Sequence, residues 1–428
     1  MPFKTNPKIA VVGLGYVGLP LAVALARHFS VLGFDIDSKR IKDLKNGFDR
    51  TNEIEPEILK TTTLHTTDNS AELTHHDIYI ITVPTPVTKD NLPDLEPLKK
   101  ASETVGKALS KGAIVVYEST VYPGVTEDFC GPVLETHSGL KAGHDFYLGY
   151  SPERINPGDK EHTVERITKV VSGQTPRVAK ELEKVYGKLN DGNIFVAKNI
   201  KTAEAAKVIE NAQRDINIAF INEIATIVGK LGLSIYDVLD AANTKWNFLP
   251  FQPGLVGGHC IGVDPYYLAQ CARQLEHEPE VILAGRRTNE QMGQHIATEI
   301  HQELQKMKVS NAKILVLGVT FKEDIPDLRN TKVVDVIQGL KSYGHYIDIH
   351  DPFADANEAD IHLNLKLLPN FDHANEYDCI VGAVSHHPYL QFSQDTFKQL
   401  LREKGLIADI KNMWRNSTLP EGARYWSL

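Results

Sequence analysis

The feature that most restricts how this chain can fold is a glycine triplet between an apolar run and a helical stretch. Residues 8–13 read KIAVVG, which predicts a short buried strand, and an apolar segment over 17–29 predicts a helix. Between them lies G-L-G-Y-V-G at 13–18, and the next predicted strand, VLGFDID, contains Asp35, 22 residues after Gly13. A strand, a glycine-rich turn, a helix and an acidic residue at the end of the following strand indicate a dinucleotide-binding βαβ unit.

Each position of this turn has a physical role. Gly13 makes the tight turn, Gly15 lets the backbone approach a pyrophosphate, and Gly18 lets the helix pack closely on the strand. Asp35 accepts hydrogen bonds from ribose hydroxyls and repels a 2′-phosphate, which favours NAD over NADP. The alternative is an ordinary βα turn that contains three glycines. The predicted cofactor-binding residues are Gly13, Gly15, Tyr16, Val17, Gly18, Asp35, Arg40, Pro84, Thr85 and Thr120.

Strand-like runs alternate with helical segments in two parts of the chain. The first part continues with IYIITV at 78–83 and AIVVYEST at 113–120, and AKILVLG at 312–318 begins the second. Residues 202–231, between the two parts, are helical throughout and apolar on more than one face, which indicates burial between domains or between subunits. The predicted fold class is α/β, with two Rossmann-like doubly wound parallel-sheet domains joined by a long central helix.

Charge and cysteine content exclude several classes of protein. A formal net charge of −9 and the lack of a basic run argue against nucleic-acid binding, although a few local cations can still hold an anionic substrate. No apolar stretch reaches the roughly 20 residues that span a bilayer, and no signal peptide is apparent. Four scattered cysteines are too few for a disulfide framework or a zinc ribbon. We therefore expect a cytoplasmic protein without a metal or a membrane partner, in which a reduced cysteine can do chemistry.

One cysteine, Cys260, lies in the glycine-rich segment FLPFQPGLVGGHCIGVDPYY at 248–267. Glycines let a backbone approach a ligand closely and supply N–H donors. Asp264 and Pro265 have the pattern of an N-cap and a first helical residue, and a thiolate just ahead of a helix N-terminus is stabilised. The alternative is a buried, inert thiol beside a flexible loop, and the residues alone leave both readings open.

Other polar residues lie where a ligand is expected. Lys207 and Asn211, four residues apart, share a face of the long helix amid apolar residues, or else form a solvated helix edge. Thr120 and Glu153 follow predicted strands near the carboxyl edge of the first sheet, where ligands bind in such sheets. The alternative for both is an ordinary polar loop residue.

The second α/β part lacks the glycine triplet and is a poor dinucleotide site. GVTFK at 318–322 follows its first strand, and a mononucleotide moiety could still bind there with Lys322 and Arg329 as phosphate partners. From spacing alone, two solvated cations are the favoured reading.

Seven stretches of the sequence are highly specific: VVGLGYVGLPLA, VPTP, ESTVYPG, SPERINPG, AEAAKVIENA, PGLVGGHCIGVDPYYL and LGVTFKEDIPDLRN. On these stretches the chain resembles the UDP-glucose/GDP-mannose dehydrogenase family over nearly its whole length. The segment around Cys260 is most similar to bacterial UDP-N-acetylglucosamine/UDP-N-acetylgalactosamine 6-dehydrogenases of the Vi-antigen and O-antigen type. His259 occupies a position that is often Ser elsewhere in the family, which leaves the choice of sugar open.

The resemblance implies three domains and a homodimer. They are an N-terminal NAD-binding Rossmann domain over 1–200, a central helical dimerisation and catalytic domain over 201–305, and a C-terminal UDP-sugar-binding Rossmann-like domain over 306–428.

The resemblance also implies roles for matching residues. Cys260 corresponds to the nucleophile, and Lys207 and Asp264 match the pair that holds a water and steadies a developing oxyanion. Asn211 matches an active-site amide. The implied catalytic residues are Cys260, Lys207, Asp264, Asn211, Glu153 and Thr120, of which the last two position the hydrolytic water. The implied substrate-binding residues are Glu153, Arg154, Lys207, Asn211, Gly254, Gly257, Gly258, Lys322 and Arg329.

The implied reaction is an NAD-dependent four-electron oxidation at C6 of a UDP-hexose, which gives the uronic acid through a thiohemiacetal and a thioester on Cys260 and serves surface-polysaccharide synthesis. UDP-GlcNAc or UDP-GalNAc is the expected sugar, with UDP-ManNAc or UDP-glucose as alternatives. Two other classes stay in view. Cys260 and Glu153 speak against a two-electron dehydrogenase, and the intact set of Lys207, Cys260 and Asp264 speaks against a catalytically dead nucleotide-sugar-binding regulator.

Overall fold

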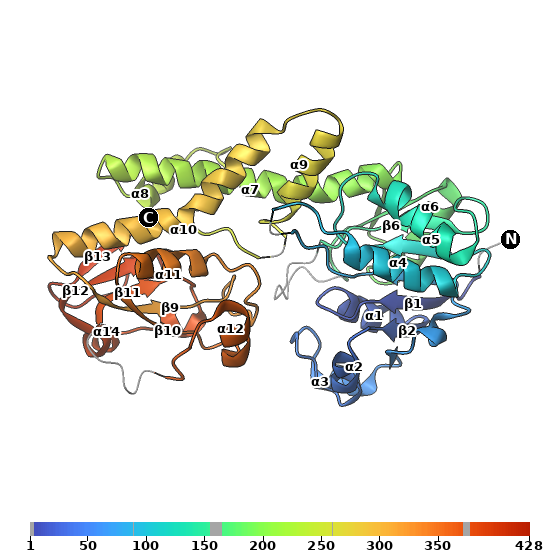
Figure 1. Ribbon diagram of the computed structural model, residues 1–428, viewed down its shortest axis with the longest axis horizontal. Coiled ribbons are helices and arrows are strands. Elements are labelled where there is room, and N and C mark those ends of the chain that lie inside the picture. Colours follow the sequence, from blue (N-terminus) through green and yellow to red (C-terminus); the bar gives the residue numbers. More distant parts are fainter. Residues whose placement is uncertain (1–3, 89, 155–164, 259, 371–376) are drawn as a thin grey trace. The chain divides into compact units, whose positions relative to one another are not determined.

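A computed structural model describes residues 4–88, 90–154, 165–258, 260–370 and 377–428. It divides into two compact units (Figure 1). Unit 1 comprises 1–211 with 266–278, and unit 2 comprises 212–265 with 279–428. His259, which the sequence singled out for sugar selection, lies outside the described residues.

Unit 1 is built on an eight-stranded sheet in the order β3-β2-β1-β4-β5-β6-β7-β8. The strands are β1 (Lys8–Val12), β2 (Ser30–Phe34), β3 (His65–Thr67), β4 (Ile78–Ile81), β5 (Ile114–Tyr117), β6 (Tyr147–Tyr150), β7 (Lys169–Gly173) and β8 (Ile194–Val196). Every neighbouring pair is parallel except β6 and β7, which run antiparallel. The order β3-β2-β1-β4-β5 places a topological switch point between β1 and β4.

Helices cover both faces of this sheet. Along β1, Ala10 and Val12 belong to one apolar core and Ile9 and Val11 to another, as the period of two in a strand requires. The first core packs against α4 (Glu96–Ala108) and α5 (Gly131–Ser138), and the second against α1 (Gly18–Ala26) and α6 (Pro176–Gly187). The shorter helices are α2 (Ser38–Lys45), α3 (Pro56–Thr61), η1 (Ser70–Leu73) and η2 (Val125–Cys130).

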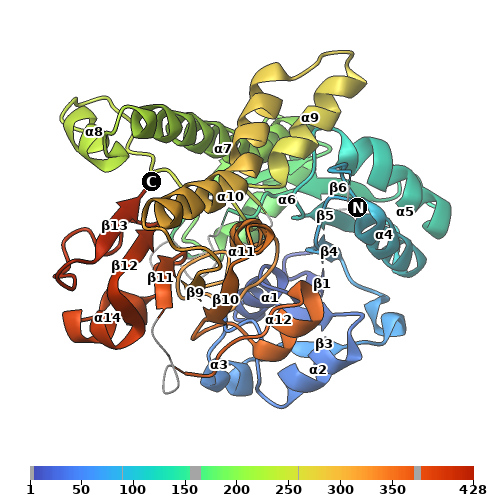
Figure 2. The same cartoon turned by 60° about the vertical axis from the view of Figure 1, so that its left-hand side comes forward.

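Unit 2 contains a five-stranded, fully parallel sheet in the order β10-β9-β11-β12-β13 (Figure 2). The strands are β9 (Lys313–Leu317), β10 (Tyr346–His350), β11 (Tyr377–Gly382), β12 (Leu401–Asp409) and β13 (Arg424–Ser427). On one face, α10 (Glu280–Lys306) and α11 (Val333–Ser342) pack together over Ile314 and Val316. On the other, Leu315 and Leu317 pack with Trp414. The remaining helices are α8 (Ile235–Ala242), α12 (Ala356–Leu363), α13 (His387–Leu390) and α14 (Gln394–Leu400).

Two helices belong to both units. α7 (Ile200–Lys230) is one continuous helix of 31 residues, which confirms the predicted long central helix, and α9 (Asp264–Gln274) begins just after the Cys260 segment. The α/β class and the two Rossmann-type sheets predicted from the sequence are confirmed. None of the described helices combines the length and apolar character needed to cross a membrane.

Candidate functional site

The turn after β1 has the geometry that a dinucleotide requires. Gly13 has φ +98°, in the left-handed region that favours glycine, and its N–H donates to the Phe34 carbonyl at 2.8 Å. A Cβ on Gly15 would meet nothing within 4 Å, so a ligand can approach the backbone there. A Cβ on Gly18 would lie 1.8 Å from the Gly13 carbonyl oxygen, so only glycine lets α1 come this close to β1. These three positions fit the pyrophosphate of a dinucleotide.

Asp35 directly follows β2 and is tied to the same turn. One carboxylate oxygen accepts the Leu14 N–H at 2.8 Å, and the other accepts the Asp37 N–H at 2.9 Å. The side chain is half-buried. Because each carboxylate oxygen has about two lone pairs, these bonds leave acceptor capacity for ribose hydroxyls. The position therefore suits the role predicted from the sequence.

Arg40 lies under the turn instead of facing outward. It is 1% exposed, its Nε donates to the Leu14 carbonyl at 2.8 Å, and its Nη1 donates to the Asp49 carboxylate at 2.7 Å. We expected Arg40 to bind the cofactor directly. An enclosed guanidinium that is paired on the protein side favours an indirect role, in which Arg40 supports the Leu14 carbonyl.

The carboxyl ends of β4 and β5 adjoin this turn. The Thr82 hydroxyl donates to the Gly13 carbonyl at 2.7 Å, which fastens the end of β4 to the glycine turn. Of the predicted cofactor residues that follow, Pro84 is exposed and Thr85 and Thr120 are half-buried. Tyr16 and Val17, between the second and third glycines, are also half-buried. All of them follow strands beside the switch point, where ligands bind in such sheets.

Glu153 follows β6 and belongs to a buried charge cluster that sequence analysis missed. The Lys169 ammonium donates to Oε2 of Glu153 at 3.1 Å and to Oε2 of Glu118 at 2.7 Å. The Tyr186 hydroxyl donates to the other oxygen of Glu118. We call these four residues the Glu153 cluster. The sequence signal was Lys169 itself, a charged residue at the start of the buried strand KVVSG.

Burial and charge act in opposite directions in the Glu153 cluster. Burial raises the pKa of Glu118, and the Lys169 ammonium opposes that rise. Burial alone would lower the pKa of Lys169, but the Glu118 and Glu153 carboxylates hold it above its ordinary value. Lys169 is therefore a permanent cation shared by two carboxylates.

The predicted ligands on α7 have different surroundings. Lys207 is 8% exposed, and among the described residues no hydrogen bond or ion pair engages its ammonium. The residue is mostly buried, but its ammonium is not fully enclosed, so a polar or anionic ligand can reach it. Asn211 is half-buried. Arg154 pairs through Nη2 with Glu210 on α7 at 2.8 Å, so a substrate contact would compete with that ion pair.

In unit 2, the backbone ahead of Cys260 is fixed at two points. The Asn222 amide donates to the Gly254 carbonyl at 3.0 Å and accepts the Gly254 N–H at 2.8 Å. The Asn330 amide donates to the Gly258 carbonyl at 2.8 Å, and the Gly258 N–H donates back to the Asn330 carbonyl at 3.2 Å. Gly258 has φ +79°, a conformation that glycine adopts without strain. These paired bonds hold the segment that leads to the thiol.

Cys260 itself is half-buried and forms no disulfide, and the other three cysteines, all within the described residues, are thiols as well. The Cys260 carbonyl accepts the N–H groups of Val263 at 3.0 Å and Asp264 at 2.8 Å. Asp264 is the first residue of α9 and is 1% exposed. The thiol thus lies four residues ahead of a helix N-terminus, as the sequence predicted.

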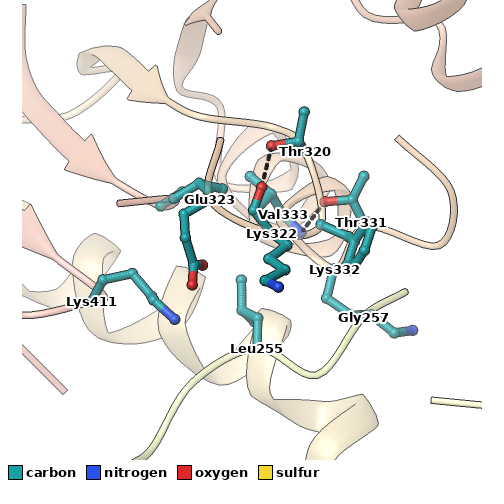
Figure 3. Close-up of a pocket in the computed structure, with 12 residues that line it drawn as sticks. Leu255, Gly257, Thr320, Lys322, Glu323, Thr331, Lys332, Val333 and Lys411 are labelled. Atoms are coloured by element: carbon teal, nitrogen blue, oxygen red, sulfur yellow. Dashed lines mark hydrogen bonds between the residues drawn. The ribbon is translucent and has the colours of Figure 1, made fainter. Parts of the chain in front are cut away.

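A pocket of unit 2 lies over the carboxyl ends of β9, β11 and β12 (Figure 3). It has about 350 Å³ of empty volume, including space open to solvent. Lys322, Glu323 and Lys411 extend into the same hollow (Figure 3). Its lining residues are Leu255, Gly257, Thr320, Phe321, Lys322, Glu323, Thr331, Lys332, Val333, Ala383, Val384 and Lys411.

The structure brings some predicted substrate residues of unit 2 together and not others. Gly257 and Lys322 line the pocket, with Lys332 and Lys411, which the sequence analysis did not select. Arg329 is not among the described lining residues, and its guanidinium pairs with Asp327 at 2.6 Å. Lys322 and Lys411 extend into the hollow beside Glu323, whereas the Lys332 ammonium pairs with Glu290 at 2.5 Å and with Asp335 at 3.3 Å. Two lysines in one hollow can hold an anionic group such as a diphosphate.

Comparison with known proteins decides the family. Models of the UDP-glucose/GDP-mannose dehydrogenase family match residues 7–190 as its NAD binding domain, 201–291 as its central domain and 315–416 as its UDP binding domain. The chain belongs to this family. It is accordingly an NAD-dependent nucleotide-sugar dehydrogenase, and the predictions of family, NAD and a UDP-binding part are confirmed.

Relatives cover the enzyme over its whole length. It is 52% identical to protein CapL of Staphylococcus aureus over 99% of this chain and 100% of that protein. It is 48% identical to the UDP-N-acetyl-D-glucosamine 6-dehydrogenase of Pseudomonas aeruginosa, over 94% of this chain and 96% of the relative. Among solved structures, the UDP-D-ManNAc dehydrogenase of Pyrococcus horikoshii superposes with a TM-score of 0.88 at 31% identity, covering 98% of both chains.

Proposed function

We propose that the enzyme oxidises C6 of UDP-N-acetylglucosamine, or of its C4 epimer, twice, to the uronic acid, through a thioester on Cys260. The observation that carries this proposal is a thiol held by paired backbone bonds just ahead of α9, in a chain 48% identical to a UDP-N-acetyl-D-glucosamine 6-dehydrogenase. An alcohol dehydrogenase that stops at the aldehyde needs no such nucleophile. UDP-ManNAc is the second candidate, because a solved relative acts on that sugar by its name.

In this proposal, different residues of the chain carry out different steps of the reaction. A water held by Lys207 and Asp264 takes the proton of the C6 hydroxyl. The glycine turn and Asp35 would hold NAD, which accepts one hydride per molecule, so two NAD molecules bound in succession would supply the acceptors for the two oxidations. The Cys260 thiolate adds to the aldehyde carbon, and Lys207 stabilises the oxyanion of the thiohemiacetal. Glu153, with Thr120, positions the water that hydrolyses the resulting thioester.

Substrate binding is proposed to use both ends of the nucleotide sugar. The lysine-lined pocket of unit 2 suits the UDP diphosphate, with Gly257 and Lys322 among its contacts. Asn211 and the Gly254–Gly258 backbone are proposed to contact the sugar, and Arg154 and Arg329 join only if they leave their present carboxylate partners. The three-domain division at 200/201 and 305/306, a cytoplasmic location and a role in surface-polysaccharide synthesis remain part of this proposal.

The stoichiometry of the cofactor tests the reaction class. Each UDP-GlcNAc consumed should yield two NADH, because alcohol to acid is a four-electron change. The measurement compares NADH absorbance with sugar consumed, for UDP-GlcNAc, UDP-GalNAc, UDP-ManNAc and UDP-glucose in parallel. One NADH per sugar would identify a two-electron dehydrogenase, and none with any of the four sugars would identify a binding protein.

Cofactor choice should depend on Asp35. NAD should support a much higher kcat/KM than NADP, because the half-buried carboxylate repels a 2′-phosphate. Asp35→Ala should lower the ratio of kcat/KM for NAD to kcat/KM for NADP by about tenfold, which corresponds to a lost repulsion of about 1.4 kcal/mol. Asp43→Ala, which removes a half-buried carboxylate on α2, is the control and should leave the NAD-to-NADP ratio of kcat/KM unchanged. Equal kcat/KM for both cofactors in the wild type would contradict the assignment.

We propose that α7 forms the core of a homodimer. Ile209, Phe220 and Ile227 are each at least half exposed. At 100° per residue they fall within about 20° of one another on the helix, so they form a single apolar stripe. An exposed stripe of this length is typical of a helix that packs on a partner.

A charge on this stripe should separate the subunits. Phe220→Glu and Ile227→Glu should each give a folded monomer in light scattering. Ile221 on the same helix is unsuitable for this test, because it is 3% exposed within the core of unit 2 and a charge there would unfold the chain. Unchanged size for both stripe variants would contradict the assignment.

A further inference from the structure

The Glu153 cluster contains more charge than a structural ion pair needs. Glu118 is 2% exposed, Lys169 1% and Glu153 8%, so two carboxylates share one ammonium away from water. A buried pair with matched charges is already costly, and a second carboxylate adds repulsion that one lysine only partly offsets. Such an arrangement is typical of sites where the basicity of one group is set by its neighbours.

The partners of the two carboxylates differ. Glu118 is held from both sides, by the Lys169 ammonium and by the Tyr186 hydroxyl of α6. Glu153 accepts the Lys169 ammonium at 3.1 Å and, at its other oxygen, the backbone N–H of Arg154 at 2.6 Å. Of the two carboxylates, the family resemblance matches only Glu153 to the hydrolytic water. Glu118 and Lys169 would therefore act on that water through Glu153.

We propose that Lys169 and Glu118 are positioning residues that set the basicity of Glu153 in opposite directions for thioester hydrolysis. This inference rests on the proposed role of Glu153. Lys169 favours the ionised form of Glu153 and fixes the orientation of its carboxylate. The negative charge of Glu118 has the opposite effect and makes the Glu153 carboxylate more basic. The basicity of Glu153 toward the water therefore depends on both neighbours, which act on it in opposite directions.

The step balances without any further reactant. The water oxygen bonds to the thioester carbonyl carbon as its proton passes to the Glu153 carboxylate. The carbon–sulfur bond then breaks, and its electron pair leaves with the sulfur as the Cys260 thiolate. Protonation of Glu153 also relieves its repulsion with Glu118, so the cluster favours the proton transfer when it occurs. Lys169 keeps its proton throughout.

The neighbours of Glu153 that carry the sign of each effect are Glu118, just after β5, and Lys169 on β7. Tyr186 on α6 and the neighbouring Arg154 also adjoin the cluster. Removing the Lys169 cation raises the pKa of Glu153, so the ionised base appears only at higher pH. Removing the Glu118 charge lowers the pKa of Glu153, so the ionised base appears at lower pH but is weaker.

The test follows decay of the Cys260 adduct by rapid quench and intact-protein mass spectrometry over a range of about pH 5 to 9. Lys169→Met should move the acid limb of the decay rate upward by about 1–2 pH units, and Glu118→Gln should move it downward by about 1. Lys169→Arg, which keeps the cation, should restore the wild-type position. If the cluster were purely structural, Lys169→Met and Glu118→Gln would lower the stability of the protein but would not move the acid limb of the decay rate in opposite directions.

Asp215→Asn is the matched control. Asp215 is fully buried and pairs with Arg286 at 2.6 Å in unit 2, so its loss should cost stability while leaving the acid limb in place. Glu118→Gln keeps the shape of the side chain, which makes the test usable even if Lys169→Met fails to fold. If Glu153→Gln accumulates an adduct but Glu118→Gln leaves the limb unmoved, this inference is wrong and the proposed function stands. If Glu153→Gln turns over normally, the proposed role of Glu153 fails first.

Discussion

Cys260→Ala should make almost no uronic acid. Without the thiol, no thiohemiacetal can form, and the aldehyde has no route to efficient second oxidation. A covalent nucleophile is commonly worth several powers of ten, so kcat for uronic acid should fall by about 10³-fold or more. The first oxidation needs no sulfur, so NADH should be limited to about one equivalent for each aldehyde produced. Product analysis by mass spectrometry, beside NADH absorbance, distinguishes the two steps.

Cys271 provides the matched control for this loss. It is the other half-buried thiol, on α9, where burial raises the pKa and makes the thiolate scarce. Cys271→Ala should therefore keep most of the activity and both equivalents of NADH. Rapid formation of uronic acid by Cys260→Ala would rule out the thioester mechanism, whatever the behaviour of the control.

The cofactor-binding half of the fold was predictable because its signals are local. A buried parallel strand reads as an apolar run, and the turn after β1 needs glycine at positions that the sequence displays within six residues. The strands β1, β2, β4 and β5 were predicted in this way, and so was β9 of unit 2. The antiparallel pairing of β6 with β7 was not, because strand direction in a sheet depends on distant segments.

The residues of the candidate site were predictable only where the local sequence around a single residue identified it. Cys260 stands out among glycines in the sequence, but the amides of Asn222 and Asn330 that fix its segment come from positions 32 and 72 residues away from the glycines they hold. The partner of Lys169 is likewise 51 residues distant in Glu118. Cofactor binding by Arg40 stays a prediction, and its buried pairing with Asp49 is a contact that the sequence did not indicate.

Glu153→Gln should stop the enzyme after both oxidations, as a thioester. The change keeps the thiol, the glycine turn and the size of the side chain, and removes only the carboxylate that takes a proton from the hydrolytic water. General acid–base assistance is typically worth about 10²–10⁴-fold, so steady-state turnover should fall by that factor. Two NADH should appear in a single burst for each active site, followed by very slow release.

The trapped species makes this prediction specific. Intact-protein mass spectrometry after mixing Glu153→Gln with UDP-sugar and NAD should show the mass of a UDP-uronoyl group, on the peptide that contains Cys260. The doubly substituted chain, Cys260→Ala with Glu153→Gln, should show no adduct, because the acceptor sulfur is gone. Since a glutamine cannot take up the proton but still fills the place of the carboxylate beside Lys169, a stall would reflect lost base chemistry and not a collapsed cluster. Wild-type turnover without an adduct would mean that some other group activates the water, and Glu153 would then lose its assigned role.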